Sequence, residues 1–490
     1  MQIISCPAPK KRREHVSLMS VDLAGMAPID VHDSETALTF VHLSDIHFRE
    51  DRTDTQYDEV QADLRNEIEL NLQALFCEVD ATGILVTGDI AFAGREAEYK
   101  SARAWFEKLS GIVRCGVDGI WVVPGNHDVD RSLIARSPSL QSAHLSVRAA
   151  SADEAHSDDA LNRYLTDPAF GNSLLSPMQE YMKFARLYGC EISKDSVCWN
   201  SPFIFHDGTT LQMRGLTSTL ISDGADAEGN LVLGSVQSIM QHHPGVVNMT
   251  LCHHPPDWLM HGTAIESRLN ARVKVQLFGH RHRFVAGVTN QCVVIVAGAT
   301  HPDPLEAGWD PRFQVIQLRI SGGSRERKLS VRLRPFVWEK ATAKFVEDKS
   351  VGPGALDWRP LALEEWVPTF AGVDVEDGGA KKVQAGSETY DKLEVMQMPP
   401  PTVPDRPIRT LAYRFMTLPF ITRLNIARQL GLIADDEELR EENVWKLVFE
   451  RTRTQKLFGD LWEEVEKAHG GAHLPDQKNP FVETDDATGG

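Results

Sequence analysis

Six short apolar runs, five of which end in histidine, aspartate or asparagine, constrain the fold of this chain more than any other feature. They are LTFVHLSD (38–45), GILVTGD (83–89), GIWVVPGNHD (119–128), VVNMTLCHH (246–254), KVQLFGHRH (274–282) and CVVIVAGA (292–299). Amphipathic stretches such as 58–78 and 95–110 lie between them, and strands that alternate with helices predict a layered α/β fold. Sites in open α/β sheets form at the carboxyl ends of strands, so the sequence predicts a site where these runs end.

The residues after the first run suggest how polar side chains meet at this site. Asp45 and His47 follow its apolar residues and lie two positions apart. On an extended strand, residues at this spacing point to the same side. We therefore expect the carboxylate and the imidazole to be directed at one point.

Length, charge and cysteine content narrow the class of protein. The 490 residues exceed one compact core, so two or more domains are expected. The formal net charge of -18 argues against a broad DNA-coating role but allows a nuclease, because bound metal ions reverse the field locally. The seven scattered cysteines include no CxxC pair and indicate reduced thiols, and we expect a cytoplasmic protein without a secretory signal. No stretch approaches the roughly 18 apolar residues of a membrane span.

Shifts in composition divide the chain. The predicted parts are an N-terminal leader (1–37), an α/β domain (38–345) with an insertion or cap (131–200), a linker rich in Gly, Pro and charge (346–407), a small all-helical domain (408–470) and a disordered tail (471–490). Within the helical domain, a short helix is expected to end at Gly431.

The polar residues that end the runs form a set of metal-binding type. The residues at these ends are Asp45, His47, Asp89, Asn126, His127, Asp128, His253, His254, His280 and His282, and two aspartates, an asparagine and four histidines among them make a mixed ligand set. Oxygen and nitrogen donors without a thiolate suit Mn, Fe or Zn, and the set is large enough for two ions. Gly88, Gly125 and Gly279 directly precede these residues, where the chain must turn sharply.

Together the motifs DxH, GD, GNHD, HH and GHxH, in this order, resemble the calcineurin-like metallophosphoesterases over residues 38–335. The resemblance implies a four-layer α/β/β/α sandwich with a dinuclear centre. Carried over by position, it implies one ion held by Asp45, His47 and His282, a second held by Asn126, His253 and His280, and Asp89 as the bridge. It further implies that His127 contacts phosphate and protonates the leaving oxygen, and that Asp128 orients His127 by accepting its other ring N–H.

The expected reaction is hydrolysis of a phosphate ester by a hydroxide held between two divalent ions. Thr217-Ser218, followed by Gly234…Gln237 and HHPP, resembles the bacterial cyclic-nucleotide phosphodiesterase branch. A phosphodiester of a nucleotide or nucleic acid is therefore the favoured substrate. The alternatives are a phosphomonoesterase and a nucleotide-binding scaffold that acts through its helical tail. Arg281 and His254 are candidate substrate contacts, although an exposed role for Arg281 is the simpler alternative.

The C-terminal helical segment has its own resemblance. Leu418-Pro419, Arg423, Ile426-Ala427 and Leu430-Gly431-Leu432 are similar to positions in the adaptor domains of bacterial conflict and defence effectors. Such domains recruit protein partners that carry a like domain. The alternatives are a lid and a module for homo-oligomerisation.

Overall fold

The computed structural model describes residues 27–50, 55–302, 310–323, 325–351, 357–366, 403, 406–434, 441–470 and 479–481. The predicted disordered tail lies outside these ranges except for 479–481, as do residues 1–26 of the leader and most of the linker. None of the helices in the described ranges has the length and apolar character of a membrane span.

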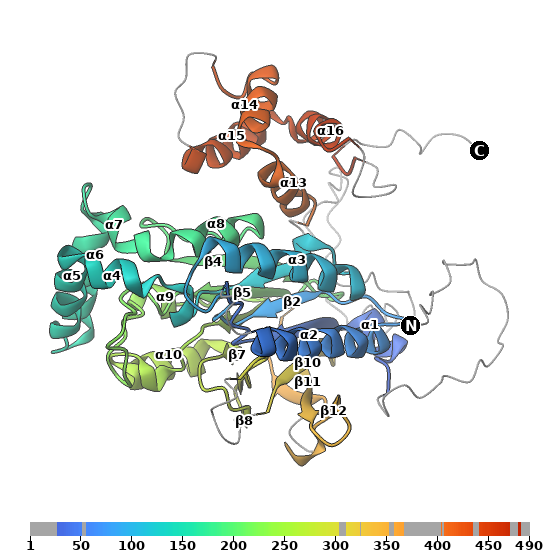
Figure 1. Ribbon diagram of the computed structural model, residues 1–490. Coiled ribbons are helices and arrows are strands. Elements are labelled where there is room, and N and C mark those ends of the chain that lie inside the picture. Colours follow the sequence, from blue (N-terminus) through green and yellow to red (C-terminus); the bar gives the residue numbers. More distant parts are fainter. Residues whose placement is uncertain are drawn as a thin grey trace, which may run out of the picture.

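Two mixed sheets form the centre of the molecule (Figure 1). The first has the order β12-β11-β10-β1-β2-β3, with β13 also paired to β11, and the second has the order β4-β5-β6-β7-β9-β8. The strands of the first sheet are β1 (Leu38–Leu43), β2 (Gly83–Val86), β3 (Ile120–Val122), β10 (Arg312–Ser321), β11 (Lys328–Glu339), β12 (Lys344–Glu347) and β13 (Arg359–Ala362). Those of the second are β4 (Cys198–Ile204), β5 (Thr210–Leu216), β6 (Val246–Leu251), β7 (Val273–Phe278), β8 (Val285–Val288) and β9 (Val293–Val296).

The sheets pack face to face through large aromatic side chains. The ring of Phe203 on β4 lies 5.4 Å from that of Phe40 on β1 and 5.0 Å from that of Trp121 on β3, measured between centroids. Helices cover the outer faces: α2 (Thr55–Leu75) and α3 (Glu96–Ile112) on the first sheet, and α10 (Gly262–Arg272) on the second. Because both faces of β1 are covered, all six of its residues are buried. The predicted four-layer α/β/β/α sandwich is confirmed.

The stretch predicted as an insertion or cap is helical. It contains α4 (Arg131–Arg136), α5 (Pro138–Ala149), α6 (Glu154–Thr166), α7 (Gly171–Leu175) and α8 (Gln179–Leu187), and β4 begins inside its last residues. Side-chain caps begin these helices: Ser137 accepts from the backbone N–H of Leu140 before α5, and Asp153 accepts from that of His156 before α6. Helices α4 to α7 gather at one end of the sandwich (Figure 1).

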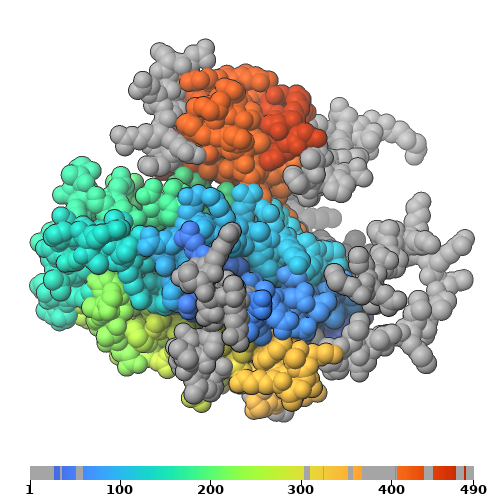
Figure 2. All heavy atoms as spheres, viewed as in Figure 1, coloured from blue at the N-terminus to red at the C-terminus, as the bar shows by residue number. Residues whose placement is uncertain are grey.

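A separate helical module follows, and we use that name for residues 406–470. It comprises α13 (Arg406–Thr417), α14 (Phe420–Gln429), α15 (Glu441–Gln455) and α16 (Phe458–Ala468), which bury an apolar cluster of their own. Figure 2 shows it as a distinct mass against the sandwich. Gly431 follows α14 with φ of 66°, the left-handed geometry of a helix-ending glycine, as expected.

Arginines of α13 attach this module to β3, the edge strand of the first sheet. Arg409 Nε donates to the carbonyl of Asp118 at 2.8 Å and its Nη2 donates to that of Ile120 at 2.6 Å. The guanidinium also lies 4.5 Å from the Trp121 ring centroid. Arg406 Nε donates to the Asp118 carboxylate at 2.7 Å. The sheet itself extends past residue 345, because β13 pairs with β11 inside the stretch expected to be a linker.

Candidate metal centre

Glycines allow the loops after the strands to meet. A Cβ on Gly125 would lie 2.1 Å from Asp89 Oδ1, and one on Gly279 would lie 2.3 Å from Ser44 Oγ. Gly88 has φ of 90°, and a Cβ there would lie 2.7 Å from His253 Nδ1. Any larger residue at these positions would push the polar side chains apart.

The backbone at the strand ends is left-handed. Asp45, His47, Asp89, His280 and His282 have φ between 52° and 69°. Side chains other than glycine seldom adopt this conformation, and where they do it is commonly at functional sites. The premise that Asp45 and His47 lie on an extended strand is therefore wrong, because β1 ends at Leu43. Both side chains still reach one point, since two left-handed turns bring them there.

One half of the centre contains Asp45, His47, Asp89 and His282. One nitrogen or oxygen atom from each lies within 4.8 Å of those of the others. His282 Nε2 is 3.2 Å from Asp45 Oδ1, and His47 Nε2 is 3.3 Å from Asp89 Oδ2. None of these side chains is more than 15% exposed.

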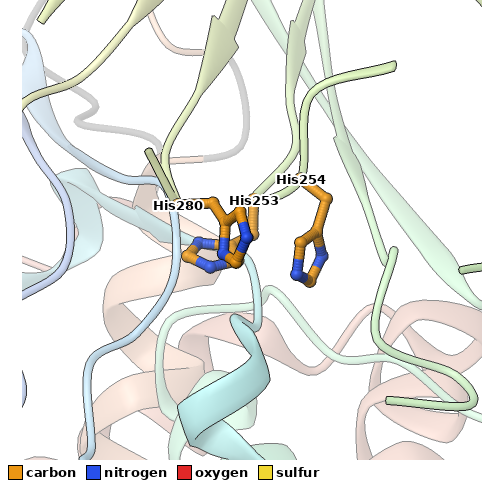
Figure 3. A group of neighbouring side chains, drawn as sticks. All are labelled: His253, His254 and His280. Carbon is orange, nitrogen blue, oxygen red and sulfur yellow. The ribbon is translucent and has the colours of Figure 1, made fainter. Parts of the chain in front are cut away.

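The other half is built around Asn126 on the turn after β3. Its Oδ1 lies 3.0 Å from His253 Nε2 and 3.0 Å from His280 Nδ1. His253 Nε2 is also 3.3 Å from Asp89 Oδ2, so the Asp89 carboxylate faces both halves. His254 stands beside His253 and His280, and Figure 3 shows the three rings together. The two halves therefore share one carboxylate.

Comparison with known proteins decides the family. The model for calcineurin-like phosphoesterases matches residues 38–284, about half of the chain. This chain belongs to the calcineurin-like phosphoesterase family. The model for the GTPase-associated adaptor domain matches residues 407–467, within the helical module. No curated protein matches the chain.

Solved structures resemble this phosphoesterase only distantly. A putative 5′-nucleotidase from Staphylococcus aureus is 12% identical with a TM-score of 0.31, and the match covers 70% of this chain and 57% of that one. Vacuolar protein sorting 29 from Cryptosporidium parvum is 10% identical with a TM-score of 0.26, covering 64% and 97%. A predicted phosphoesterase from Streptococcus pneumoniae is 8% identical with a TM-score of 0.23, covering 61% and 98%. The chain thus spans little more than half of the nucleotidase.

The donor set of this phosphoesterase fits two divalent cations. Two buried carboxylates, one amide oxygen and four imidazoles converge without a thiolate. Burial alone would raise the pKa of Asp45, but His282 and His253 together outweigh it and lower the pKa to about 2. Burial likewise opposes ionisation of Asp89, yet His253 and His127 hold its pKa well below the usual value. The carboxylates therefore stay charged and attract cations.

The two adjacent histidines differ in their partners. His253 Nδ1 contacts the carbonyl of Thr87 at 2.8 Å, which leaves Nε2 directed at Asn126 and Asp89. His254 Nδ1 instead contacts Ser218 Oγ at 2.8 Å. A ligand imidazole commonly has its second nitrogen on a backbone carbonyl, and only His253 has that arrangement.

The prediction that Asp128 accepts a ring N–H of His127 is wrong. Its Nδ1 donates to the carbonyl of Phe92 at 2.7 Å, not to Asp128, and its backbone N–H donates to Asp89 Oδ1 at 2.7 Å. The ring centroids of His127 and His47 lie 4.8 Å apart. Phe92 therefore fixes the Nδ1 hydrogen and leaves Nε2 as the nitrogen that can exchange a proton.

Asp128 holds the two loops together instead. Its carboxylate accepts from the backbone N–H groups of Ala91 and Gly125, each at 2.9 Å, and of Ile90 at 3.2 Å. It also accepts from Tyr99 Oη at 2.8 Å. Asp128 thus ties the loop after β2 to the turn that carries Asn126 and His127.

Two further residues complete the surroundings. Arg281 is 43% exposed and forms an ion pair with Asp257, which agrees with the simpler of its two predicted roles. The sequence reasoning missed His301, whose backbone N–H donates to the Asp45 carbonyl at 3.1 Å and whose Nδ1 donates to that of Ile46 at 2.7 Å. His301 lies just beyond CVVIVAGA, the one run without a polar end, and its position there was the available signal.

Proposed function

We propose that this phosphoesterase hydrolyses a phosphodiester of a nucleotide or nucleic acid with two divalent ions, Mn, Fe or Zn. The shared Asp89 carboxylate carries the proposal, because it faces both donor clusters. Asp45, His47 and His282 would hold one ion, and Asn126, His253 and His280 the other. When bound, such a pair polarises the phosphoryl group and activates water.

The residues around the centre support the proton transfer. With its Nδ1 hydrogen on the Phe92 carbonyl, His127 presents Nε2 to a leaving oxygen. Burial lowers the pKa of His127, so its protonated form gives up a proton more readily than an ordinary imidazolium. The preference for a diester rests on the resemblance of Thr217-Ser218 and Gln237 to the cyclic-nucleotide phosphodiesterase branch. These residues form one loop beside His254: the Gln237 side chain forms hydrogen bonds with the backbone N–H and C=O of Thr217, at 2.7 and 2.9 Å, and Ser218 contacts His254.

The test is turnover by the purified protein with Mn²⁺. The substrates are bis-p-nitrophenyl phosphate, p-nitrophenyl phosphate, a cyclic nucleotide, and single-stranded and duplex DNA. We expect diester cleavage that His127→Ala reduces by about a hundredfold or more, with the metal content unchanged. His156→Ala, at an exposed histidine on α6, is the matched control. Turnover of the monoester alone would favour a phosphomonoesterase, and tight nucleotide binding without any turnover would favour a scaffold.

Metal affinity is expected to depend on pH. Burial alone would lower the pKa of His253, but the Asp89 carboxylate outweighs it and raises the pKa to about 9 in the metal-free protein. A ligand imidazole must be neutral, so metal binding below this pH displaces a proton. We expect the affinity for Zn²⁺ to rise by up to about tenfold per unit between about pH 7 and pH 8.5. Competition with a chelator of known affinity measures this, and an affinity that is constant over this range contradicts it.

We further propose that the helical module binds a protein partner. The match to an adaptor domain supports this, and so does the apolar cluster that the four helices bury among themselves. Its attachment to β3 through Arg409 leaves α14 facing outward, where Ile421 is 65% exposed. A pull-down with the module as bait, compared with a pull-down by the full chain, would identify such a partner or show that the module binds a second copy of this chain.

A further inference from the structure

One arginine near the centre is held only loosely by its surroundings. Arg131 is the first residue of α4, which begins three residues after the turn that carries Asn126 and His127. The carboxylate nearest to its guanidinium is that of Asp226, and Nη2 lies 4.0 Å from Asp226 Oδ2, beyond hydrogen-bonding distance. Its buried Nε has no hydrogen-bond partner among the described residues.

Asp226 has hydrogen-bond partners other than Arg131. It accepts from Arg148 Nη2 at 3.1 Å and from the backbone N–H of Asp223 at 2.9 Å, and Ser222 donates to its second oxygen. Arg148 also donates to Asp223 at 2.8 Å, so Arg131 remains a charge partner of Asp226, but its guanidinium forms no hydrogen bond with that carboxylate. Arg281 differs, since it has an ion pair with Asp257. The donors of Arg131 therefore remain available to a ligand.

The position of Arg131 indicates which part of a ligand it meets. The side chains that would hold metal in the first half of the centre are at most 15% exposed, whereas Arg131 is 40% exposed. The Arg131 side chain is therefore more open to solvent than those side chains. Arg131 follows His127 by four positions and stands at the start of the helix that leaves this turn.

We infer that Arg131 binds a phosphate group next to the scissile one, and that the substrate is an oligonucleotide. Guanidinium groups bind phosphate oxygens through two parallel hydrogen bonds, which suits a loosely paired arginine. In a chain of net charge -18, a local cation of this kind would also offset the repulsion of a polyanion. The inference rests on the proposed function and narrows its substrate class.

The test compares thymidine dinucleotides that share one diester linkage. TpT has no second phosphate, while pTpT and TpTp carry one at the 5′ or the 3′ end. We expect the wild type to have a lower KM for one of the phosphorylated forms, and Arg131→Ala to raise that KM by about tenfold or more. The KM for TpT should not change, and Arg131→Lys should restore part of the effect. Arg136→Ala removes an exposed charge from the same helix and is the control.

Two outcomes overturn the inference. In the first, Arg131→Ala raises the KM for TpT and for the phosphorylated forms equally. In the second, it changes none of these KM values while bis-p-nitrophenyl phosphate is still cleaved. If nothing is hydrolysed, the proposed function fails, and equilibrium binding of the three dinucleotides with Ca²⁺ in place of Mn²⁺ decides. A preference for a phosphorylated form that depends on Arg131 then supports the inference, and equal binding rejects it.

Discussion

An Asp89→Asn variant is expected to lose more than about a hundredfold of its turnover and to bind at most one metal ion per chain. Removing even an outer partner of a metal ligand costs about 10- to 100-fold, so loss of a charge shared by two sites should cost more. Asp89 Oδ2 lies 3.3 Å from both His47 Nε2 and His253 Nε2. Without that charge, two cations would lose the carboxylate whose Oδ2 faces both donor clusters.

The asparagine preserves the local fold. Asp89 Oδ1 accepts the His127 backbone N–H at 2.7 Å, and an amide oxygen can do the same. Elemental analysis gives the metal stoichiometry, turnover of bis-p-nitrophenyl phosphate gives the rate, and circular dichroism verifies folding. Asp257→Asn, which removes an exposed carboxylate paired with Arg281, is the control. Two bound ions with nearly full turnover would remove Asp89 from its proposed role.

The second large effect is on stability. Asp128→Ala is expected to lower the free energy of unfolding by about 4 kcal/mol or more, because each of four buried donors left without a partner costs about 1 to 3 kcal/mol. The donors are the backbone N–H groups of Ile90, Ala91 and Gly125, together with Tyr99 Oη. All of them lie where water cannot readily replace the carboxylate, since Asp128 is fully buried.

Urea unfolding of the metal-free protein measures this loss without a contribution from bound ions. Tyr99→Phe removes only one of the hydrogen bonds and should cost about 1 kcal/mol. A loss for Asp128→Ala that is no greater than for Tyr99→Phe would mean that the carboxylate does not hold the two loops together. The same variant should lose turnover, because the Asn126–His127 turn would no longer be fixed to the loop that carries Asp89.

The sequence was informative where one physical rule dominates. Apolar runs bounded by polar residues predicted β1, β2, β6, β7 and β9, because buried strands between helices need apolar side chains on both faces. The same rule placed the polar ends at one edge, and the structure does bring Asp45, Asp89 and Asn126 together with the histidines.

What the sequence could not predict depends on backbone geometry and long-range contact. The left-handed turns at Asp45 and His47 contradict the extended pattern of the residues before them, and only contacts with the loop at Asp89 explain them. The partner of His127 is the Phe92 carbonyl, and a backbone carbonyl has no signature in the sequence. The carboxylate at Asp128 suggested an orienting group, whereas its partners are backbone N–H groups from two loops.

The contact between Arg409 and β3 could not be predicted either, because it joins residues far apart in the sequence. The helices of the module could be expected from their apolar spacing, but which face of which strand they meet depends on the fold of both parts. Arg409 lies in a stretch with several arginines, and only the structure distinguishes it from its neighbours.

This contact has a consequence for how the chain can be divided. Open strand edges invite a second chain to pair with them, and proteins cover such edges to avoid aggregation. In this protein side chains cover the edge. Arg409 donates hydrogen bonds to the carbonyls of Asp118 and Ile120, and Tyr181 and Trp199 donate to the carbonyl of Val122. A sandwich domain without its helical module would leave part of that edge uncovered. A recombinant fragment that ends before Arg409 would therefore be prone to self-association. Transfer of the helical module to another protein would require an equivalent uncovered strand.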